Sequence, residues 1–163
     1  MATGLLYDSI FLEHDTGPGH PERPERLSLT FDHLRNLPWF KDLKPLKPRK
    51  AEAEWLSAVH APGYLRHAEE TCRLGLSYLD TPDVAISGNS FDIALLAAGG
   101  ALEMADQVIS GDIQNGFALV RPPGHHAENA AALGFCLMNN AAILARYLQK
   151  KHGKMLTQIF LKR

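Results

Sequence analysis

The sequence predicts an α/β fold with a mostly parallel sheet, and the order of its apolar segments is the main reason. Short apolar runs that suit strands alternate with longer segments whose apolar residues recur every three or four positions, as in helices. Strands that alternate with helices in this way form parallel sheets. The chain has 163 residues, of which 45% are hydrophobic and 21% charged, and these values suit one globular domain.

The predicted strands are short. Residues 3–7 form the first and residues 43–48 the second. Residues 117–120, with the sequence Phe-Ala-Leu-Val, are uniformly apolar and are predicted to be a buried strand. Residues 155–161 are predicted to add a further strand.

The predicted helices lie between these strands. Pro24 suits the first turn of one helix, Ser90 can cap another, and Gly153 suits the end of the last. Gly99-Gly100 lowers helix propensity, so the presence of this pair inside a helix indicates that the helix packs closely against the sheet there. Loops are expected over 11–24 and 79–88. The helices are predicted over residues 26–37, 52–59, 62–74, 90–111 and 135–151.

Charge and cysteine content exclude several classes of protein. A net charge of −1 argues against a broad surface for nucleic acid, so no direct nucleic-acid binding is expected. Two cysteines without Cys-x-x-Cys spacing, Cys72 and Cys136, argue against a disulfide framework and fit a reducing compartment. The first residues do not resemble a signal peptide, and no apolar run is long enough to span a bilayer. We therefore expect an intracellular protein, cytoplasmic or nuclear, without membrane attachment.

A pair of adjacent histidines is the strongest indication of chemistry. His125 and His126 follow a predicted strand through the stiff segment Arg-Pro-Pro-Gly, residues 121–124. In parallel sheets, ligands bind beyond the carboxyl ends of the strands, which is where this pair falls. Imidazoles exchange protons near neutral pH, so the two side chains could act as a base and its electrostatic partner, or could bind a metal. The phosphate-binding, dinucleotide-binding and serine-hydrolase motifs are absent.

Two segments around this pair resemble the histone deacetylase family in its broad sense. These are RPPGHHA at residues 121–127 and GFCLMNN at residues 134–140, and GHPERP at 19–24 and HAPGY at 60–64 agree with them. The family includes class II-like deacetylases, acetoin-utilisation proteins and acetylpolyamine amidohydrolases. The resemblance covers roughly residues 5–153. It implies an arginase-like three-layer fold and, over residues 1–163, a single partial domain that is incomplete at the C-terminus.

The resemblance also implies a reaction and a set of roles. The family hydrolyses the acetyl amide of acetyl-lysine, in histones or other proteins, or of an acetylated polyamine, with the help of zinc. By this resemblance, His126 is the general base and His125 the partner that tunes the charged intermediate. Phe135 lines a narrow tunnel for the acylated stem, with Gly134 beside it.

A carboxylate at the rim of that tunnel holds the substrate backbone in the family. Asp80 is the predicted match, and Asp83 competes with it for this role. His14, His20, His60 and His67 show no spacing typical of metal ligands. We expect surface, loop-packing or capping roles for these four histidines.

The metal ligands of the family are missing from the sequence. They come from an Asp-x-His motif on the strand after the 135–151 helix and from a later Asp, and a transition-state-stabilising Tyr lies further on. Here no Asp or Glu follows Glu128, and Lys150 stands two residues before His152. Residues 157–160 resemble the stretch that normally follows the ligand motif, which suggests an internal deletion. We therefore predict no metal ligands and no deacetylase activity for this chain alone.

Two alternatives remain at this stage. The chain could be a non-catalytic module that binds an acyl-lysine or a protein partner. It could also be a truncation product without a stable role.

Overall fold

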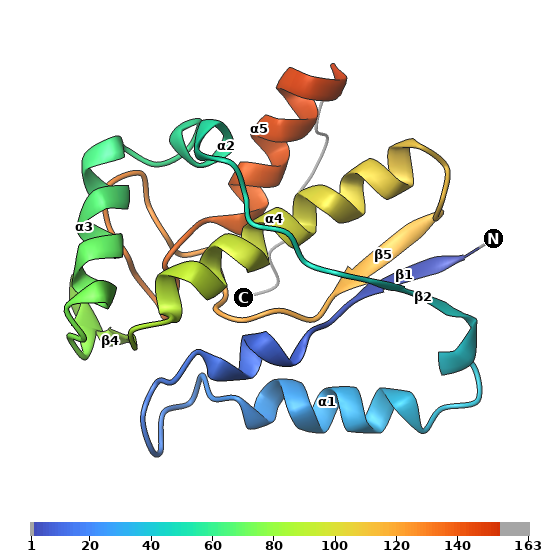
Figure 1. Ribbon diagram of the computed structural model, residues 1–163, viewed down its shortest axis with the longest axis horizontal. Helices are drawn as coiled ribbons and strands as arrows, with labels where there is room; N and C mark the ends of the chain where they lie inside the picture. The colour runs from blue at the N-terminus through green and yellow to red at the C-terminus, as the bar shows by residue number, and fades with distance from the viewer. Residues whose placement is uncertain (1, 154–163) are drawn as a thin grey trace.

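A three-stranded parallel sheet lies at the centre of the computed structural model, which describes residues 2–153 (Figure 1). The central strand β1 (Thr3–Leu6) pairs with β2 (Leu43–Leu46) on one side and with β5 (Asn115–Ala118) on the other. A separate antiparallel pair is formed by β3 (Tyr78–Leu79) and β4 (Thr81–Ala85). The predicted α/β class with a mostly parallel sheet is confirmed.

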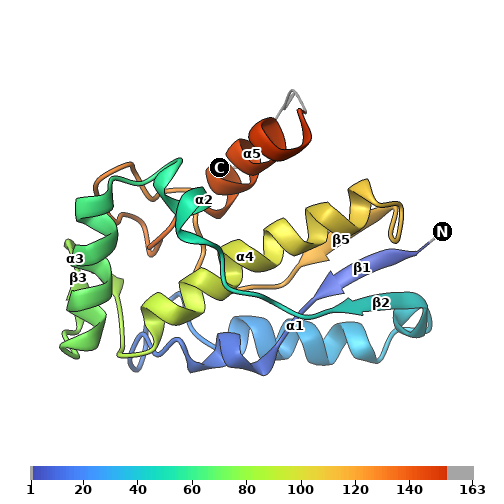
Figure 2. The same cartoon turned by 45° about the horizontal axis from the view of Figure 1, so that its top comes forward.

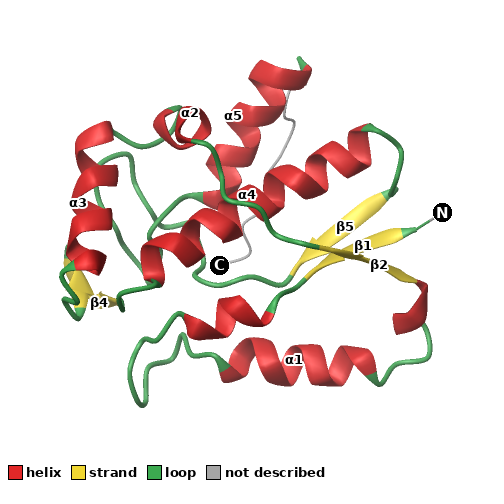
Figure 3. Cartoon of the chain, viewed as in Figure 1, coloured by secondary structure: helices red, strands yellow, loops and turns green. Residues whose placement is uncertain are grey.

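Helices cover both faces of the sheet and make three layers. Figures 1 and 2 show α1 on one side of the strands and α4 on the other. Figure 3 shows α1 and α4 beside the three adjacent strands, and α3 apart from them next to β4. The helices are α1 (Glu25–Arg35), α2 (Ala53–Ser57), α3 (Pro62–Arg73), α4 (Ser90–Ile109) and α5 (Asn140–His152), with short 3-10 helices η1 (Ser9–Glu13) and η2 (Phe40–Asp42).

Three boundary predictions are wrong. The helix predicted from residue 135 begins at Asn140, because Gly134 and Phe135 have φ angles of +58° and +68° that no right-handed helix accepts. The loop predicted over 79–88 contains strand β4, and the loop over 11–24 begins within η1. The helix end at Gly153 is confirmed by its left-handed φ of +60°. The strand predicted over 155–161 lies outside the described residues.

Ser90 does not cap α4 as predicted. It is the first residue of the helix, and Asn89 occupies the capping position. The Ser90 hydroxyl instead accepts the Ser87 N–H at 2.8 Å and lies 2.7 Å from Nδ1 of His14. The Ser90 hydroxyl thus contacts His14, in a loop distant in sequence, and does not cap the helix.

The prediction of a buried strand at residues 117–120 is only partly right. The strand covers Asn115–Ala118, and the Phe117 side chain is 53% exposed. Within residues 2–153, β5 forms one edge of the sheet and β2 the other. Pro45 in β2 has no N–H to offer a further strand, whereas β5 contains no proline and exposes an aromatic ring. A groove lined by Met104, Val108, Leu144 and Leu148 runs beside β5, so apolar surface lies open there.

The largest core cluster lies among α3, α4 and α5, and the glycine pair of α4 brings this helix close to its neighbours. A Cβ at Gly100 would lie 2.4 Å from a methyl group of Leu6, so this glycine packs against β1 as predicted. A Cβ at Gly99 would lie 2.1 Å from the carbonyl oxygen of Arg49 and 2.4 Å from the Ala51 nitrogen. Gly99 therefore packs against backbone that leads into α2, not against the sheet. No helix within residues 2–153 is long and apolar enough to cross a membrane.

We predict that Gly99→Ala destabilises the protein although alanine is the better helix former. The gain of about 1 kcal/mol in helix propensity is smaller than the cost of moving backbone, and we expect a net loss of about 1–3 kcal/mol in urea unfolding. Gly63→Ala in α3 is the matched control, because its added Cβ would meet no described residue within 4 Å apart from its chain neighbours and the nearby backbone of its own helix. Equal stability of the two variants would contradict the packing argument.

Candidate active site

The two histidines occupy the corners of one tight turn. The N–H of Ala127 donates to the Gly124 carbonyl at 3.2 Å, which leaves His125 and His126 as the two central residues. Both imidazoles are exposed, while Gly124 and Ala127 are buried. The imidazole centroids lie 4.2 Å apart, with an angle of 52° between the ring planes. The fold thus presents two neighbouring imidazoles to solvent on a buried base.

The segment that leads into α5 holds both ends of this turn. A Cβ at Gly124 would lie 2.5 Å from the Met138 carbonyl oxygen and 2.6 Å from the Asn140 nitrogen, so only glycine fits there. The side-chain amide of Asn139 donates to the Ala127 carbonyl at 3.0 Å. The end of the RPPGHHA motif and the end of the GFCLMNN motif are therefore in direct contact.

Gly134 and Phe135 lie beside His126. A Cβ at Gly134 would lie 2.6 Å from Cδ2 of His126, so the imidazole rests directly on the glycine. The Phe135 ring meets the His20 ring edge to face, with centroids 4.9 Å apart. A positive φ at a bulky residue such as Phe135 is rare and is typical of functional sites. The structure brings these predicted residues together and adds His20, which sequence reasoning treated as a packing residue.

The two candidate carboxylates differ in their surroundings. Asp80 accepts the Ala132 N–H at 2.7 Å and lies 3.0 Å from Nε2 of His67, so both its oxygens are engaged. Asp83 is exposed and accepts the N–H of Gly134 at 3.0 Å. Asp83, the competing candidate, is therefore bonded to the Gly134–Phe135 step, whereas Asp80 ties the preceding loop to α3.

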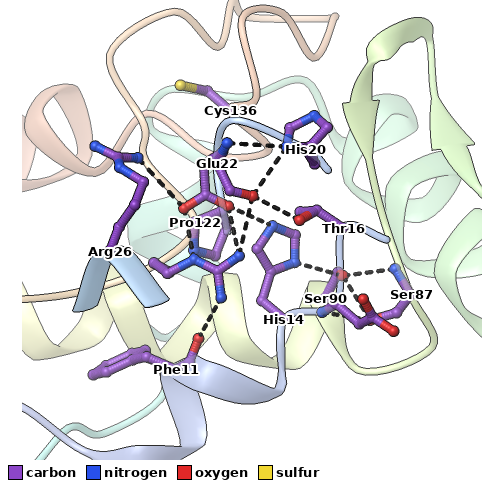
Figure 4. A network of polar contacts seen from close by, with 12 residues as sticks. Phe11, His14, Thr16, His20, Glu22, Arg26, Ser87, Ser90, Pro122 and Cys136 are labelled. Carbon is purple, nitrogen blue, oxygen red and sulfur yellow. Dashed lines mark hydrogen bonds and ion pairs between the residues drawn. The ribbon is translucent and has the colours of Figure 1, made fainter. Parts of the chain in front are cut away.

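A buried ion pair anchors the segment that carries the histidines (Figure 4). Arg121 donates from Nε to Oε1 of Glu22 at 2.6 Å and from Nη2 to Oε2 at 2.7 Å, and both residues are 1% exposed. A third Arg121 nitrogen donates to the Phe11 carbonyl at 3.2 Å. Such bidentate pairs fix both distance and orientation. Sequence reasoning did not find this pair, and its only signal is that Glu22 lies in the family motif GHPERP and Arg121 in RPPGHHA.

His14 completes the buried network. Its Nε2 lies 3.6 Å from the Glu22 carboxylate and its Nδ1 lies 2.7 Å from the Ser90 hydroxyl, as Figure 4 shows. Burial lowers the pKa of His14 to about 4, and the charge of Glu22 only partly opposes this effect. His14 is therefore neutral at neutral pH. Since a carboxylate cannot donate, the neutral ring places its proton on Nε2 and accepts the serine hydroxyl at Nδ1.

His60 and His67 take supporting positions. The buried His60 accepts the backbone N–H of Asn139 at its Nε2, with a distance of 2.9 Å, and burial lowers its pKa. His67 is exposed on α3 and pairs with Asp80. The cysteines are buried free thiols, and burial raises the pKa of Cys72 to about 11.

The described residues do not offer a metal site. Within residues 2–153, no group of three or more His, Cys, Asp and Glu side chains is placed to hold a metal ion. A catalytic zinc ion needs three protein ligands and one open position. The zinc implied by the family resemblance therefore has no fitting ligand set in this part of the chain.

Comparison with known proteins agrees with this fold. The family model of the histone deacetylase domain matches residues 20–160. A probable deacetylase of Archaeoglobus fulgidus is 42% identical over 93% of this chain and 42% of its own length. The human polyamine deacetylase HDAC10 is 44% identical over 93% of this chain but only 22% of its own length. The crystal structure of the HDA15 HD domain superposes with a TM-score of 0.85 and 36% identity, over 92% of this chain and 43% of that chain.

A three-layer α/β domain with paired imidazoles on the segment that follows β5 is the class that the fold and site define. The chain belongs to the histone deacetylase domain family. It spans less than half the length of these relatives.

We predict that Glu22→Gln costs about 3–5 kcal/mol of stability, because it leaves the buried Arg121 guanidinium without a counter-charge. The change is measured by urea unfolding at neutral pH. Glu25→Gln is the control, since Glu25 pairs with Arg23 at the exposed surface and should cost less than about 1 kcal/mol. If both variants lose the same small amount, the buried pair does not anchor the fold.

Stability should also fall in mild acid because of His14. Its folded pKa of about 4 lies below the unfolded value of 6.5, so below pH 6.5 the unfolded chain gains a proton that the folded chain refuses. This loss grows as the pH falls from 6.5 towards 4 and should reach about 2 kcal/mol at pH 5. His14→Gln should flatten the dependence measured by urea unfolding, while His33→Gln on exposed α1 should not. An unchanged slope in His14→Gln would rule out His14 as the cause.

Proposed function

We propose that this chain supplies the imidazole half of a deacetylase active site. The reaction is hydrolysis of the acetyl amide of acetyl-lysine, in histones or other proteins, or of an acetylated polyamine, and it releases acetate and the free amine. One observation carries the proposal: His126 lies on Gly134 beside Phe135, at the corner of a fixed turn, in a member of the histone deacetylase domain family. The relatives that are named deacetylases support the class of reaction in this proposal.

In this proposal His126 is the general base. Its exposed ring can accept a proton from a water molecule that attacks the acetyl carbonyl, and can then return it to the leaving amine. His125, with its ring 4.2 Å away, adjusts the charge that develops on His126. Phe135 and Gly134 form the wall along which the aliphatic stem of the substrate lies.

The rim carboxylate in this proposal is Asp83, with Asp80 in support. Asp83 is exposed and is bonded to the N–H of Gly134, so it can also accept an N–H of the substrate beside the tunnel wall. Both oxygens of Asp80 are engaged within the chain, which suits a residue that holds the loop before Gly134.

The metal-dependent half of the reaction lies outside this proposal. Residues 2–153 offer no ligand set for zinc, and no acidic residue follows Glu128 in the sequence. We therefore expect the 163-residue chain alone to recognise an acetylated amine without hydrolysing it.

We predict that an acetyl-lysine peptide shifts the NMR signals of Gly134 and His126 in the purified chain, whereas the same peptide without the acetyl group does not. Phe135→Ala should weaken this effect, because it removes the wall against the stem. The same samples, with and without added zinc, should release no acetate. Shifts that do not depend on the acetyl group would contradict acetyl-amine recognition. Acetate release that His126→Ala abolishes would show instead that the chain carries a complete site.

A further inference from the structure

Asn139 joins three separate parts of the molecule through one side chain and its own N–H. Its side-chain oxygen accepts the Ala142 N–H at 3.0 Å and so caps α5. Its side-chain amide donates to the carbonyl of Ala127 at 3.0 Å. Its backbone N–H donates to Nε2 of the buried His60 at 2.9 Å. A helix cap needs only the first of these contacts, so the other two call for a separate explanation.

The second contact falls on the last residue of the histidine turn. A turn closed by one hydrogen bond still needs its ends held, and Gly124 is held by close approach to Met138 and Asn140. Ala127 is held by the Asn139 amide. His125 and His126 are exposed, so few neighbours pack around their rings. The direction in which the two rings point is therefore set mainly by the buried backbone beneath them.

The third contact holds Asn139 itself in place. The Asn139 N–H donates to Nε2 of the buried His60, so this nitrogen carries no proton, and burial lowers the pKa of the ring in the same sense. The chain on either side of His60 is joined to the segment after the turn. The side-chain amide of Asn129 donates to the Val59 carbonyl at 2.5 Å, and the backbone carbonyl of Asn129 accepts the Ala61 N–H at 2.8 Å. The turn, the start of α5 and the entry to α3 therefore form one connected unit.

We propose that Asn139 is a positioning residue for the imidazole pair, and that its amide bond to Ala127 sets the direction in which His126 points. The importance of that direction rests on the proposed function of His126. The positioning itself is a property of the free chain and does not depend on any substrate.

The test separates the cap from the positioning contact. Asn139→Ser keeps an oxygen that can cap α5, because serine and asparagine are equally good caps, but its hydroxyl is too short to reach Ala127. Asn139→Ala loses both contacts. We expect Asn139→Ser to unfold in urea near the wild-type midpoint and Asn139→Ala to unfold earlier.

The decisive readout is the His126 ring. In the wild-type chain, a nuclear Overhauser effect should connect the His126 Hδ2 proton with the Gly134 Hα protons. Both Asn139 variants should lose this signal and show exchange broadening at His125 and His126. Asn89→Ser, at the capping position of α4, is the matched control and should keep the signal. If Asn139→Ser keeps the wild-type signal and line widths, Asn139 is only a helix cap.

A measurement on the wild-type chain guards against variants that do not fold. The Asn139 side-chain amide should exchange slowly with solvent and show scalar coupling through its hydrogen bond to the Ala127 carbonyl carbon. Rapid exchange without coupling would overturn the proposal. None of these measurements uses an acetylated substrate. They can therefore confirm the positioning role of Asn139 even if the chain does not recognise an acetylated amine. Equally, if they contradict the positioning role, the peptide-binding experiment still tests recognition of the acetylated amine.

Discussion

The buried pair of Glu22 and Arg121 is the interaction on which the rest of the structure depends. It joins two segments that are 99 residues apart, and the buried Arg121 guanidinium would be an uncompensated charge without Glu22. Through Phe11, His14 and Ser90 the same network reaches η1 and the start of α4. Because Arg121 lies four residues before His125, the pair also fixes where the chain enters the histidine turn. Structural stability and the placement of the site therefore share one cause.

The site combines a rigid base with open side chains. The histidine turn is anchored before its first residue by Arg121 and at its ends by the segment of Met138 to Asn140. The imidazoles themselves remain exposed, and the ring of His126 lies against Gly134 on one side and near the ring of His125. This arrangement suits groups that must meet a substrate and exchange protons without moving the backbone.

Much of the fold follows from local patterns, and the exceptions have physical reasons. Alternating apolar segments predicted the three parallel strands and the five helices. The segment from Phe135 to Met138 has apolar spacing typical of a helix, but the positive φ angles at Gly134 and Phe135 prevent one, and spacing does not reveal φ. Phe117 is exposed although it is apolar, because it lies on β5 at one edge of the described sheet, a position that the apolar run does not reveal. The adjacency of His126 to Gly134 was predictable through family motifs. The pairing of Glu22 with His14 and Arg121 was not, because an ion pair between distant loops leaves no local pattern in the sequence.

The position of β1 in the middle of the sheet has a consequence for the order of folding. As the chain is synthesised, β1 appears first, yet its partner on one side is β5, in which Asn115 pairs with Thr3. A parallel strand cannot be completed by a local hairpin, so one edge of β1 stays unpaired until β5 has been synthesised. Long-range pairing of this kind slows folding, although the entropy of closing the loop grows only with the logarithm of its length. Helices α2, α3 and α4 lie between β2 and β5 and can form in the meantime, so the pairing of β1 with β5 follows them.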